Sequence, residues 1–187
     1  YLISIFGKIL NTPRKNYQRI GAAVECIHSY SLIHDDLPSM DNDDFRRGKL
    51  SVHKKFTEAQ AILAGDSLHD IAFEIISDKK THPDPNVRIK IIYELATTLG
   101  SKGLAGGQSL DIYFENKKIS MPKILQIYKM KTSALFCFCC SASFIIAERK
   151  PSEIVFAKQY GTLFGLIFQI IDDYLDEFGE FKQIGKT

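Results

Sequence analysis

The sequence lacks the features that mark membrane, secreted and nucleic-acid-binding proteins. No stretch approaches the roughly 18 consecutive apolar residues of a membrane span, and nothing at the start resembles a signal peptide. There is no long block of like charges, and 24 Lys and Arg residues nearly balance 22 Asp and Glu residues. These absences predict a cytoplasmic protein with no membrane span and no nucleic-acid partner.

Disulfide and redox motifs are also scarce. Three of the four cysteines lie close together in an apolar run, at Cys137, Cys139 and Cys140. Neighbouring positions on one helix are poorly placed to form a disulfide, and free cysteine behaves as a small buried hydrophobic residue. We therefore predict reduced thiols in the core. Cys137 and Cys140 have CxxC spacing, but no βαβ pattern surrounds them, which argues against a redox role.

Helix signals recur where strand signals are nearly absent. Thr57 and Gln60 have the spacing of a capping box, and Asp84 precedes a proline, as is typical of a first helical turn. At 45% hydrophobic residues, the chain can bury a large core. We predict one all-α domain over residues 1–187. Its long helices are expected over 12–37, 57–77, 84–99, 120–148 and 151–178, with a long charged loop over 38–56.

Two patterns predict how these helices pack. Apolar residues at helical spacing mark the core face of the first helix, at Ile20, Ala23, Val24 and Ile27. Gly100, Gly103 and Gly106 stand three apart in a helical stretch, where each glycine costs about 1 kcal/mol relative to alanine. They follow no strand and form no GxGxxG motif. We interpret them as sites of close helix packing.

Two aspartate clusters lie at the ends of apolar helices. They consist of Asp35, Asp36 and Asp41, and of Asp172, Asp173 and Asp176. Asp172 and Asp176 are one helical turn apart, so their carboxylates share a face about 5–6 Å apart. Carboxylates held together beside apolar surface repel one another and resist desolvation. Either cluster alone is equally consistent with a solvated acidic helix end. Two of them, each with bases nearby, favour a paired metal site.

Oxygen ligands select hard cations, and Mg²⁺ takes one or two carboxylates per ion with water and phosphate completing its shell. We therefore predict Mg²⁺ ions that hold a diphosphate between the clusters. Other metal sites fit less well. An EF-hand loop starting at Asp41 would need glycine where Arg46 stands, and the ExxH pattern of Glu25 and His28 has no second copy. The five histidines are too scattered for a zinc site.

Four motifs in order resemble those of the trans-isoprenyl diphosphate synthases, the polyprenyl synthetase family. Residues 35–48 resemble the family's first aspartate-rich motif, and residues 168–176 resemble the second. Between them, Gly106-Gly107-Gln108 and Lys131-Thr132 match its GGQ and KT signatures. The resemblance covers essentially the whole chain. It implies an isoprenoid-synthase-type bundle of long helices around a central apolar cavity, usually in a homodimer.

The resemblance also implies a cofactor and its ligands. The cofactor would be Mg²⁺, with three ions per active site when diphosphate is bound. Asp35, Asp41 and Asp172 would be direct ligands. Asp36, Asp173 and Asp176 would complete the two motifs directly or through water.

By the same resemblance, the substrates would be isopentenyl diphosphate and an allylic diphosphate. Arg46 would contact the allylic diphosphate, and Arg47 and His53 the isopentenyl diphosphate. Lys131 would hold the departing diphosphate, and the Thr132 carbonyl and the Gln169 side chain would face the developing carbocation. Gln108 would help to order this wall, and Lys186 would be the lysine of the mobile loop that closes over the allylic substrate. For Arg46 and Arg47, the alternative is a solvated basic pair beside Asp43 and Asp44. For Gln169, it is a hydrogen-bonded core amide.

The expected chemistry explains these residue types. An allylic diphosphate ionises only when the charge on its leaving group is neutralised, which Mg²⁺, lysine and arginine achieve. The cation then alkylates isopentenyl diphosphate, and an apolar cavity excludes water. Tyr30, five positions before Asp35, would form the floor for the growing chain. With the Pro38-Ser39 insertion, it resembles members that stop at fifteen carbons, farnesyl diphosphate. Geranylgeranyl and other short-chain products remain alternatives.

Some family elements are missing from the sequence. It lacks the amino-terminal Gly-Lys-x-x-Arg element and the helices expected after the second aspartate motif. We therefore expect the chain to be part of a longer protein. Two other classes share the fold. A non-catalytic subunit of a heteromeric prenyl synthase would be expected to lose one aspartate motif, and a class I terpene cyclase would carry a different second metal motif.

Overall fold

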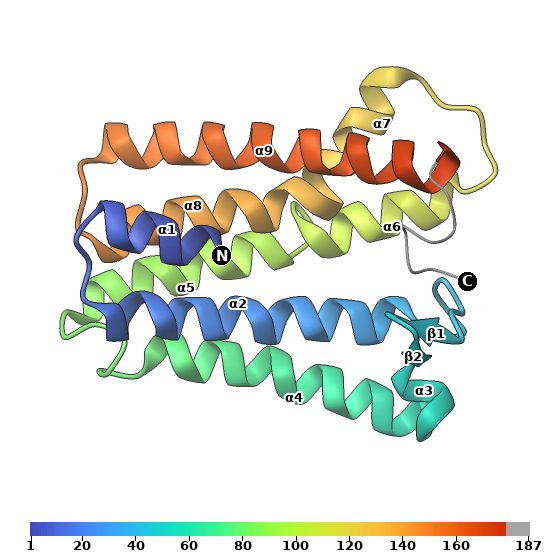
Figure 1. The fold of residues 1–187 in the computed structure, drawn as a ribbon, viewed down its shortest axis with the longest axis horizontal. Coiled ribbons are helices and arrows are strands. Elements are labelled where there is room, and N and C mark those ends of the chain that lie inside the picture. Colours follow the sequence, from blue (N-terminus) through green and yellow to red (C-terminus); the bar gives the residue numbers. More distant parts are fainter. Residues whose placement is uncertain (179–187) are drawn as a thin grey trace.

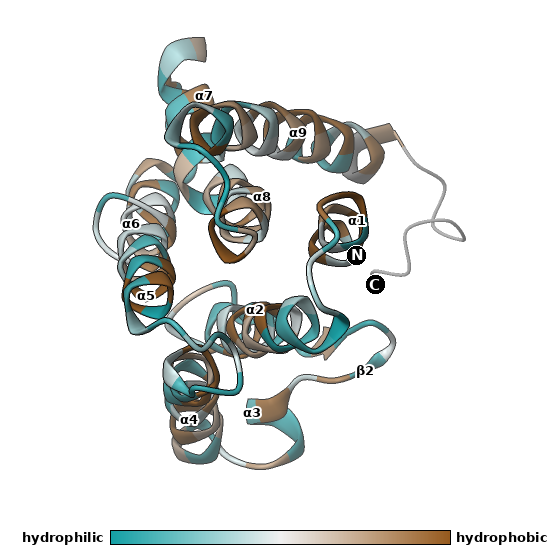
Figure 2. Ribbon diagram, turned by 90° about the vertical axis from the view of Figure 1, so that its left-hand side faces the viewer, coloured by the Kyte–Doolittle hydropathy of each residue, from teal (hydrophilic) through white to brown (hydrophobic). Residues whose placement is uncertain are grey.

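In the computed structural model, which describes residues 1–178, the chain folds as a bundle of helices (Figure 1). The long helices lie along a common axis, and α8 lies between the others in the end-on view of Figure 2. The all-α prediction is confirmed. The elements are α1 (Leu2–Ile9), α2 (Arg14–Asp35), β1 (Phe45–Arg46), β2 (Lys49–Leu50), α3 (Val52–Lys55), α4 (Glu58–Ser77), α5 (Pro85–Leu99), α6 (Leu104–Phe114), α7 (Met121–Tyr128), the π-helical turn η1 (Lys129–Ser133), α8 (Ala134–Ile146) and α9 (Pro151–Phe178).

The predicted caps at the starts of α4 and α5 are confirmed. The Thr57 hydroxyl accepts a hydrogen bond from the backbone N–H of Gln60 at 3.1 Å. The Asp84 carboxylate accepts one from the N–H of Asn86 at 2.8 Å, with Pro85 as the first helical residue. Each cap satisfies an N–H group that has no partner within the helix.

The start of α2 differs from the prediction. Pro13 takes the cap position with extended backbone angles, and the helix begins at Arg14. Thr12 supplies no cap. Its N–H bonds to the carbonyl oxygen of Gly7, and its hydroxyl is buried without a partner among the described residues. Because Thr12 is hydrogen-bonded to α1, it does not serve as the N-cap of α2.

The expected helix over 120–148 is interrupted. The turn η1 separates α7 from α8 and adds one residue to the helical repeat. The segment 38–56 is also not a simple loop, because β1 and β2 pair as an antiparallel hairpin, with Phe45 opposite Leu50, before the short helix α3. Neither η1 nor the hairpin could be predicted from the sequence, because neither produces a regular spacing of hydrophobic residues.

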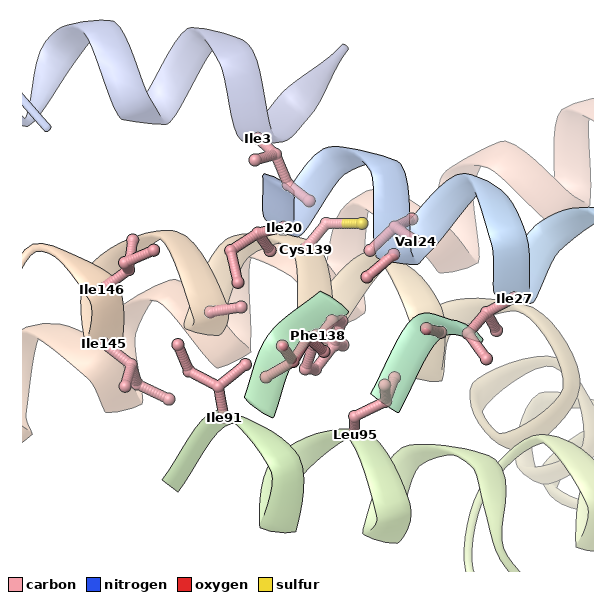
Figure 3. Close-up of a cluster of buried hydrophobic side chains, with 14 of the residues drawn as sticks. Ile3, Ile20, Val24, Ile27, Ile91, Leu95, Phe138, Cys139, Ile145 and Ile146 are labelled. Atoms are coloured by element: carbon pink, nitrogen blue, oxygen red, sulfur yellow. The ribbon is translucent and has the colours of Figure 1, made fainter. Parts of the chain in front are cut away.

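The core forms where α2, α5 and α8 meet (Figure 3). Phe138 of α8 is 1% exposed and lies between the apolar faces of α2 and α5. Every predicted core residue of α2 is buried: Ile20, Ala23, Val24 and Ile27. All four cysteines are free thiols, and two of them, Cys139 and Cys140, are buried. The central cavity expected from the family resemblance stays a prediction.

Helix α9 leaves an apolar face uncovered by the described residues, which includes Phe156, Leu163 and Ile167. By length and composition alone, the helical segments 121–146 and 151–175 could each cross a membrane. The most apolar part of the first is 50% buried and that of the second 22% buried within the bundle. Core helices of soluble proteins meet the same criterion. The absence of a membrane span therefore stays a prediction.

Two of the three spaced glycines play a different part from the one predicted. Gly100 and Gly103 end α5 and begin α6, so they form a turn and do not continue one helix. Gly106 lies within α6 and packs closely as predicted, because a Cβ atom there would lie 2.9 Å from Cε of Met130 in η1. The next residue, Gly107, is closer still to η1, since its Cβ atom would lie 2.3 Å from the backbone nitrogen of Lys131. On the opposite side of η1, a Cβ on Gly165 of α9 would lie 2.5 Å from the Cα of Ser133. The π turn is thus held between two glycines.

We expect Gly107→Ala to lower the free energy of unfolding by about 1–3 kcal/mol, because the added methyl group meets backbone that cannot rotate away. Urea titration followed by circular dichroism measures the change. The matched control is Gly21→Ala on α2, where a Cβ would meet nothing within 4 Å. That change should stabilise the helix by up to about 1 kcal/mol. Equal effects of the two substitutions would contradict the close approach.

Candidate active site

The two aspartate motifs lie at the same end of the bundle, and the β1–β2 hairpin is found at that end, next to α2 (Figure 1). Helix α2 ends at Asp35, and α9 runs in the same direction and carries Asp172 and Asp173 near its end. The tertiary structure therefore places at one end of the bundle two segments that are more than a hundred residues apart in the sequence.

The first motif folds back on itself. The backbone N–H of Asp41 donates to the carbonyl oxygen of Asp35 at 2.9 Å, which returns Asp41 to the end of α2. Asp36 is 3% exposed and accepts hydrogen bonds from Arg46, with the Nε atom at 2.9 Å. Arg46 also contacts Asp43 at 3.2 Å. The guanidinium therefore neutralises Asp36 and leaves Asp35 and Asp41 facing Lys131.

Lys131, from η1, projects toward the first motif. Its Nζ donates to Asp111 of α6 at 2.7 Å. Burial lowers the pKa of Lys131, but the hydrogen bond to Asp111 and the charges of Asp35 and Asp41 outweigh it, so the pKa is raised overall. The ammonium group therefore stays charged among carboxylates, where it can attract an anionic leaving group.

Asp35 is the most strongly perturbed carboxylate of the motif. Burial raises its pKa to about 6, partly opposed by Lys131 and reinforced by Asp41. Burial also raises the pKa of Asp41. The Gln108 amide of α6 donates to Asp35, while its Oε1 is buried without a partner among residues 1–178. Two crowded, desolvated carboxylates of this kind favour a bound cation.

The second motif is hydrogen-bonded to η1 and α7. Gln169 donates through its amide to Asp173 at 2.6 Å, and the Thr132 hydroxyl donates to Gln169 Oε1 at 2.5 Å. The hydroxyl of Tyr128 donates to the other oxygen of Asp173. Burial and this bond raise the pKa of Tyr128 to about 12. Gln169 is therefore a hydrogen-bonded amide here, consistent with the alternative interpretation of this residue.

The hairpin presents Arg47 at its tip. Arg47 has φ 52° and Gly48 has φ 72°, and together they form the two-residue turn between β1 and β2. Glycine or asparagine is usual at such positions, so the backbone of an arginine there is strained, at a cost of about 1 kcal/mol. Its Nη2 lies 3.4 Å from Nε2 of His28 on α2. Strained residues of this kind cluster at functional sites.

His53 lies on α3 and Tyr30 lies on α2. His53 is 8% exposed, and its Nδ1 lies 3.1 Å from the Ser51 hydroxyl. Its Nε2 is buried without a partner among the described residues. The half-buried ring of Tyr30 makes edge-to-face contacts with His34 and with His69 of α4, at centroid distances of 4.9 and 5.3 Å. The roles predicted for both residues stay predictions.

Two site residues received no role from the sequence. Asp111 follows Gln108 by three positions, so its place on the same face of α6 was available from helical spacing. Tyr128 carries no such signal, because its distance from Asp173 depends on how α7 and α9 cross. Of the predicted residues, Lys186 lies outside the described residues, and so does the side chain of Asp176.

The donor atoms at this site suit Mg²⁺. Within residues 1–178, no group of three His, Cys, Asp or Glu side chains is placed to hold a metal by itself. Mg²⁺ takes one or two carboxylates per ion and completes its shell with water and phosphate oxygens, so a site for it does not require such a group. Asp35 and Asp41 would hold one side, and Asp172 the other.

An all-α bundle with two aspartate motifs at one end defines an isoprenoid synthase. The crystal structure of an FPP/GFPP synthase from Zymomonas mobilis, in its apo form, superposes with a TM-score of 0.91 at 44% identity over 96% of this chain and 65% of that one. A geranyltransferase from Helicobacter pylori, complexed with magnesium and isoprenyl diphosphate, superposes with a TM-score of 0.87 at 33% identity over 96% of this chain and 59% of that one.

The particular family follows from the sequence. Residues 1–187 match the polyprenyl synthetase family, and the chain belongs to it. The farnesyl diphosphate synthase of Bacillus subtilis is 42% identical over 186 residues, which are 99% of this chain and 62% of that protein. The chain thus spans somewhat less than two thirds of the length of these relatives.

We expect ionised Asp35 to oppose folding when no cation is bound. Its folded-state pKa of about 6 lies above the ordinary value of 3.8. Ionisation of Asp35 therefore costs no stability below about pH 3.8, and its full destabilising effect is present above about pH 6. Asp35→Asn should therefore be more stable than the parent protein at pH 7 by of the order of 1–3 kcal/mol, with the difference disappearing toward pH 4.

Urea unfolding at a series of pH values, in the presence of a chelator, measures this difference. Asp70→Asn on α4 is the matched control, because that side chain is exposed. The same pH dependence in both variants would show that the burial of Asp35 is not responsible.

Proposed function

We propose that the chain forms the core of a Mg²⁺-dependent prenyltransferase that joins isopentenyl diphosphate to dimethylallyl or geranyl diphosphate, head to tail (1′–4), and yields farnesyl diphosphate. The observation that carries this proposal is the position of both aspartate motifs at one end of the bundle, with Lys131 beside the first. The names of the relatives support the same reaction. The cofactor is three Mg²⁺ ions per active site with diphosphate bound.

In the proposed reaction, the C1–O bond of the allylic diphosphate breaks and the diphosphate leaves with the electron pair. The double bond of isopentenyl diphosphate attacks the allylic C1 through its C4, and a proton from C2 passes to the released diphosphate. Mg²⁺ supplies charge neutralisation for the leaving group. Lys131, held by Asp111, adds a fixed positive charge that need not reorganise during the reaction.

The other residues bind and orient the substrates. Arg46 is held in place by Asp36 and would contact the allylic diphosphate, while strained Arg47 and His53 would contact the isopentenyl diphosphate. A guanidinium group matches phosphate oxygens through two parallel hydrogen bonds. Gln169 and the carbonyl of Thr132 would face the allylic carbocation, and the hydrogen bond between their side chains fixes the amide.

The assembly and cellular location are part of the same proposal. We propose a cytoplasmic homodimer with no membrane span. Apolar side chains exposed on α4 and α5 support self-association, among them Ile62, Leu63, Ile89 and Tyr93. Sedimentation equilibrium of the full-length protein tests the dimer, and a monomer at micromolar concentration would contradict it.

Incubation of the full-length protein with Mg²⁺, isopentenyl diphosphate and geranyl diphosphate tests the reaction. We expect a linear C15 product, and a chelator should abolish it. Asp35→Ala and Asp172→Ala should each lower turnover by several orders of magnitude while circular dichroism stays helical, because the cation loses a ligand. Asp70→Ala is the matched control.

Three results would argue against the proposal. A folded protein without turnover would favour a non-catalytic subunit, and a cyclic hydrocarbon would favour a terpene cyclase. Near-normal turnover in Asp35→Ala or Asp172→Ala would exclude the metal role.

Product length is the subject of a separate prediction. Tyr30 lies on α2 a little more than one turn before Asp35, and its ring is half-buried against His34 and His69. Tyr30→Ala should remove the cavity floor and shift the product from C15 to C20 or longer, as measured by chromatography. Tyr113→Ala, at an exposed position of α6, is the control. An unchanged product distribution would exclude Tyr30 as the floor, and geranylgeranyl diphosphate as the parent product would make this a longer-chain synthase.

A further inference from the structure

Asp173 is the only aspartate of the two motifs in the described chain whose two carboxylate oxygens both accept side-chain hydrogen bonds from uncharged donors. Oδ1 accepts from the Gln169 amide at 2.6 Å, and Oδ2 accepts from the Tyr128 hydroxyl. Gln169 lies on the same helix, one turn earlier. Tyr128 comes from a different element, so it is the contact that fixes Asp173 relative to the rest of the site.

Tyr128 is itself firmly placed. It is the last residue of α7 and leads directly into η1, whose backbone passes between Gly107 of α6 and Gly165 of α9. Thr132 lies on the same π turn and holds the opposite end of the Gln169 amide. Tyr128 and Thr132 thus contact α9 at two points, and the chain of bonds runs from Tyr128 through Asp173 and Gln169 to Thr132.

The two motifs differ in how their second aspartate is held. Asp36 pairs with the guanidinium of Arg46, which cancels its charge. Asp173 is held by a phenol and an amide, which fix its orientation and leave its charge intact. Each carboxylate oxygen has two lone pairs, so the two donors occupy one on each oxygen and leave the others open. The carboxylate is therefore both oriented and still able to attract a cation.

We propose that Tyr128 is a positioning residue of the second aspartate motif, whose hydroxyl orients Asp173 toward the magnesium and diphosphate that the site binds. This inference rests on the proposed function and adds a residue that acts through Asp173. Partners of this kind, one bond removed from a metal site, commonly change metal affinity by roughly 10–100-fold when they are removed.

The experiment measures binding of Mg²⁺ with inorganic pyrophosphate to the full-length protein by isothermal titration calorimetry. Tyr128→Phe keeps the ring and removes only the hydroxyl, so we expect the dissociation constant to rise roughly 10–100-fold. Tyr113→Phe is the matched control, because it removes the hydroxyl from an exposed tyrosine on α6, and its binding should equal that of the parent. Far-UV circular dichroism verifies that both variants are folded.

A double-mutant cycle with Asp173→Asn separates positioning from a general loss of structure. If Tyr128 acts through Asp173, adding Tyr128→Phe to Asp173→Asn should change pyrophosphate binding by less than about twofold. Additive losses, or a Tyr128→Phe dissociation constant equal to that of the parent, would overturn the inference.

The proposed function fails separately. A parent protein that binds no magnesium pyrophosphate and makes no prenyl product would overturn both proposals. Normal condensation by the parent together with unaffected Tyr128→Phe binding would overturn the role of Tyr128 alone.

Discussion

The site depends on one constraint, the passage of the π turn η1 between Gly107 of α6 and Gly165 of α9. Neither glycine has room for a Cβ atom, so the backbone of η1 is held on both sides. An ordinary α-helical turn would space its side chains differently. Here one short segment directs Lys131 toward the first aspartate motif and Thr132 toward the second, which couples two distant parts of the sequence.

This arrangement concentrates charge that the composition conceals. The formal net charge is only +2. Both aspartate motifs, however, lie at one end of the bundle, with Lys131 and Arg46 beside the first and Arg47 at the tip of the nearby hairpin. Burial raises the pKa of Asp35 and Asp41, so the apo site stores an unfavourable interaction that a cation would relieve. The buried charges of Asp35 and Asp41 thus lower the stability of the folded chain at the place where the proposed chemistry needs them.

Several elements could be predicted because the physics behind them is local. The capping residues Thr57 and Asp84 act on amides within three positions, and the apolar period of α2 identified Ile20 and Ile27 as core residues. Thr12, Gly100 and Gly103 were interpreted differently from what the structure shows. Thr12 is held by the end of α1, and the glycines form a turn between helices. Those outcomes depend on neighbours that spacing along one helix does not reveal.

The sequence by itself determined the helical class, the caps, the core face of α2 and the two aspartate motifs with their KT and GGQ companions, because each is a pattern of neighbouring residues. The tertiary structure alone decided which partners these residues take. It assigned Asp36 to Arg46, Asp111 to Lys131 and Tyr128 to Asp173. Such pairings depend on the crossing of helices and on close approach at single glycines, and neither leaves a period in the chain.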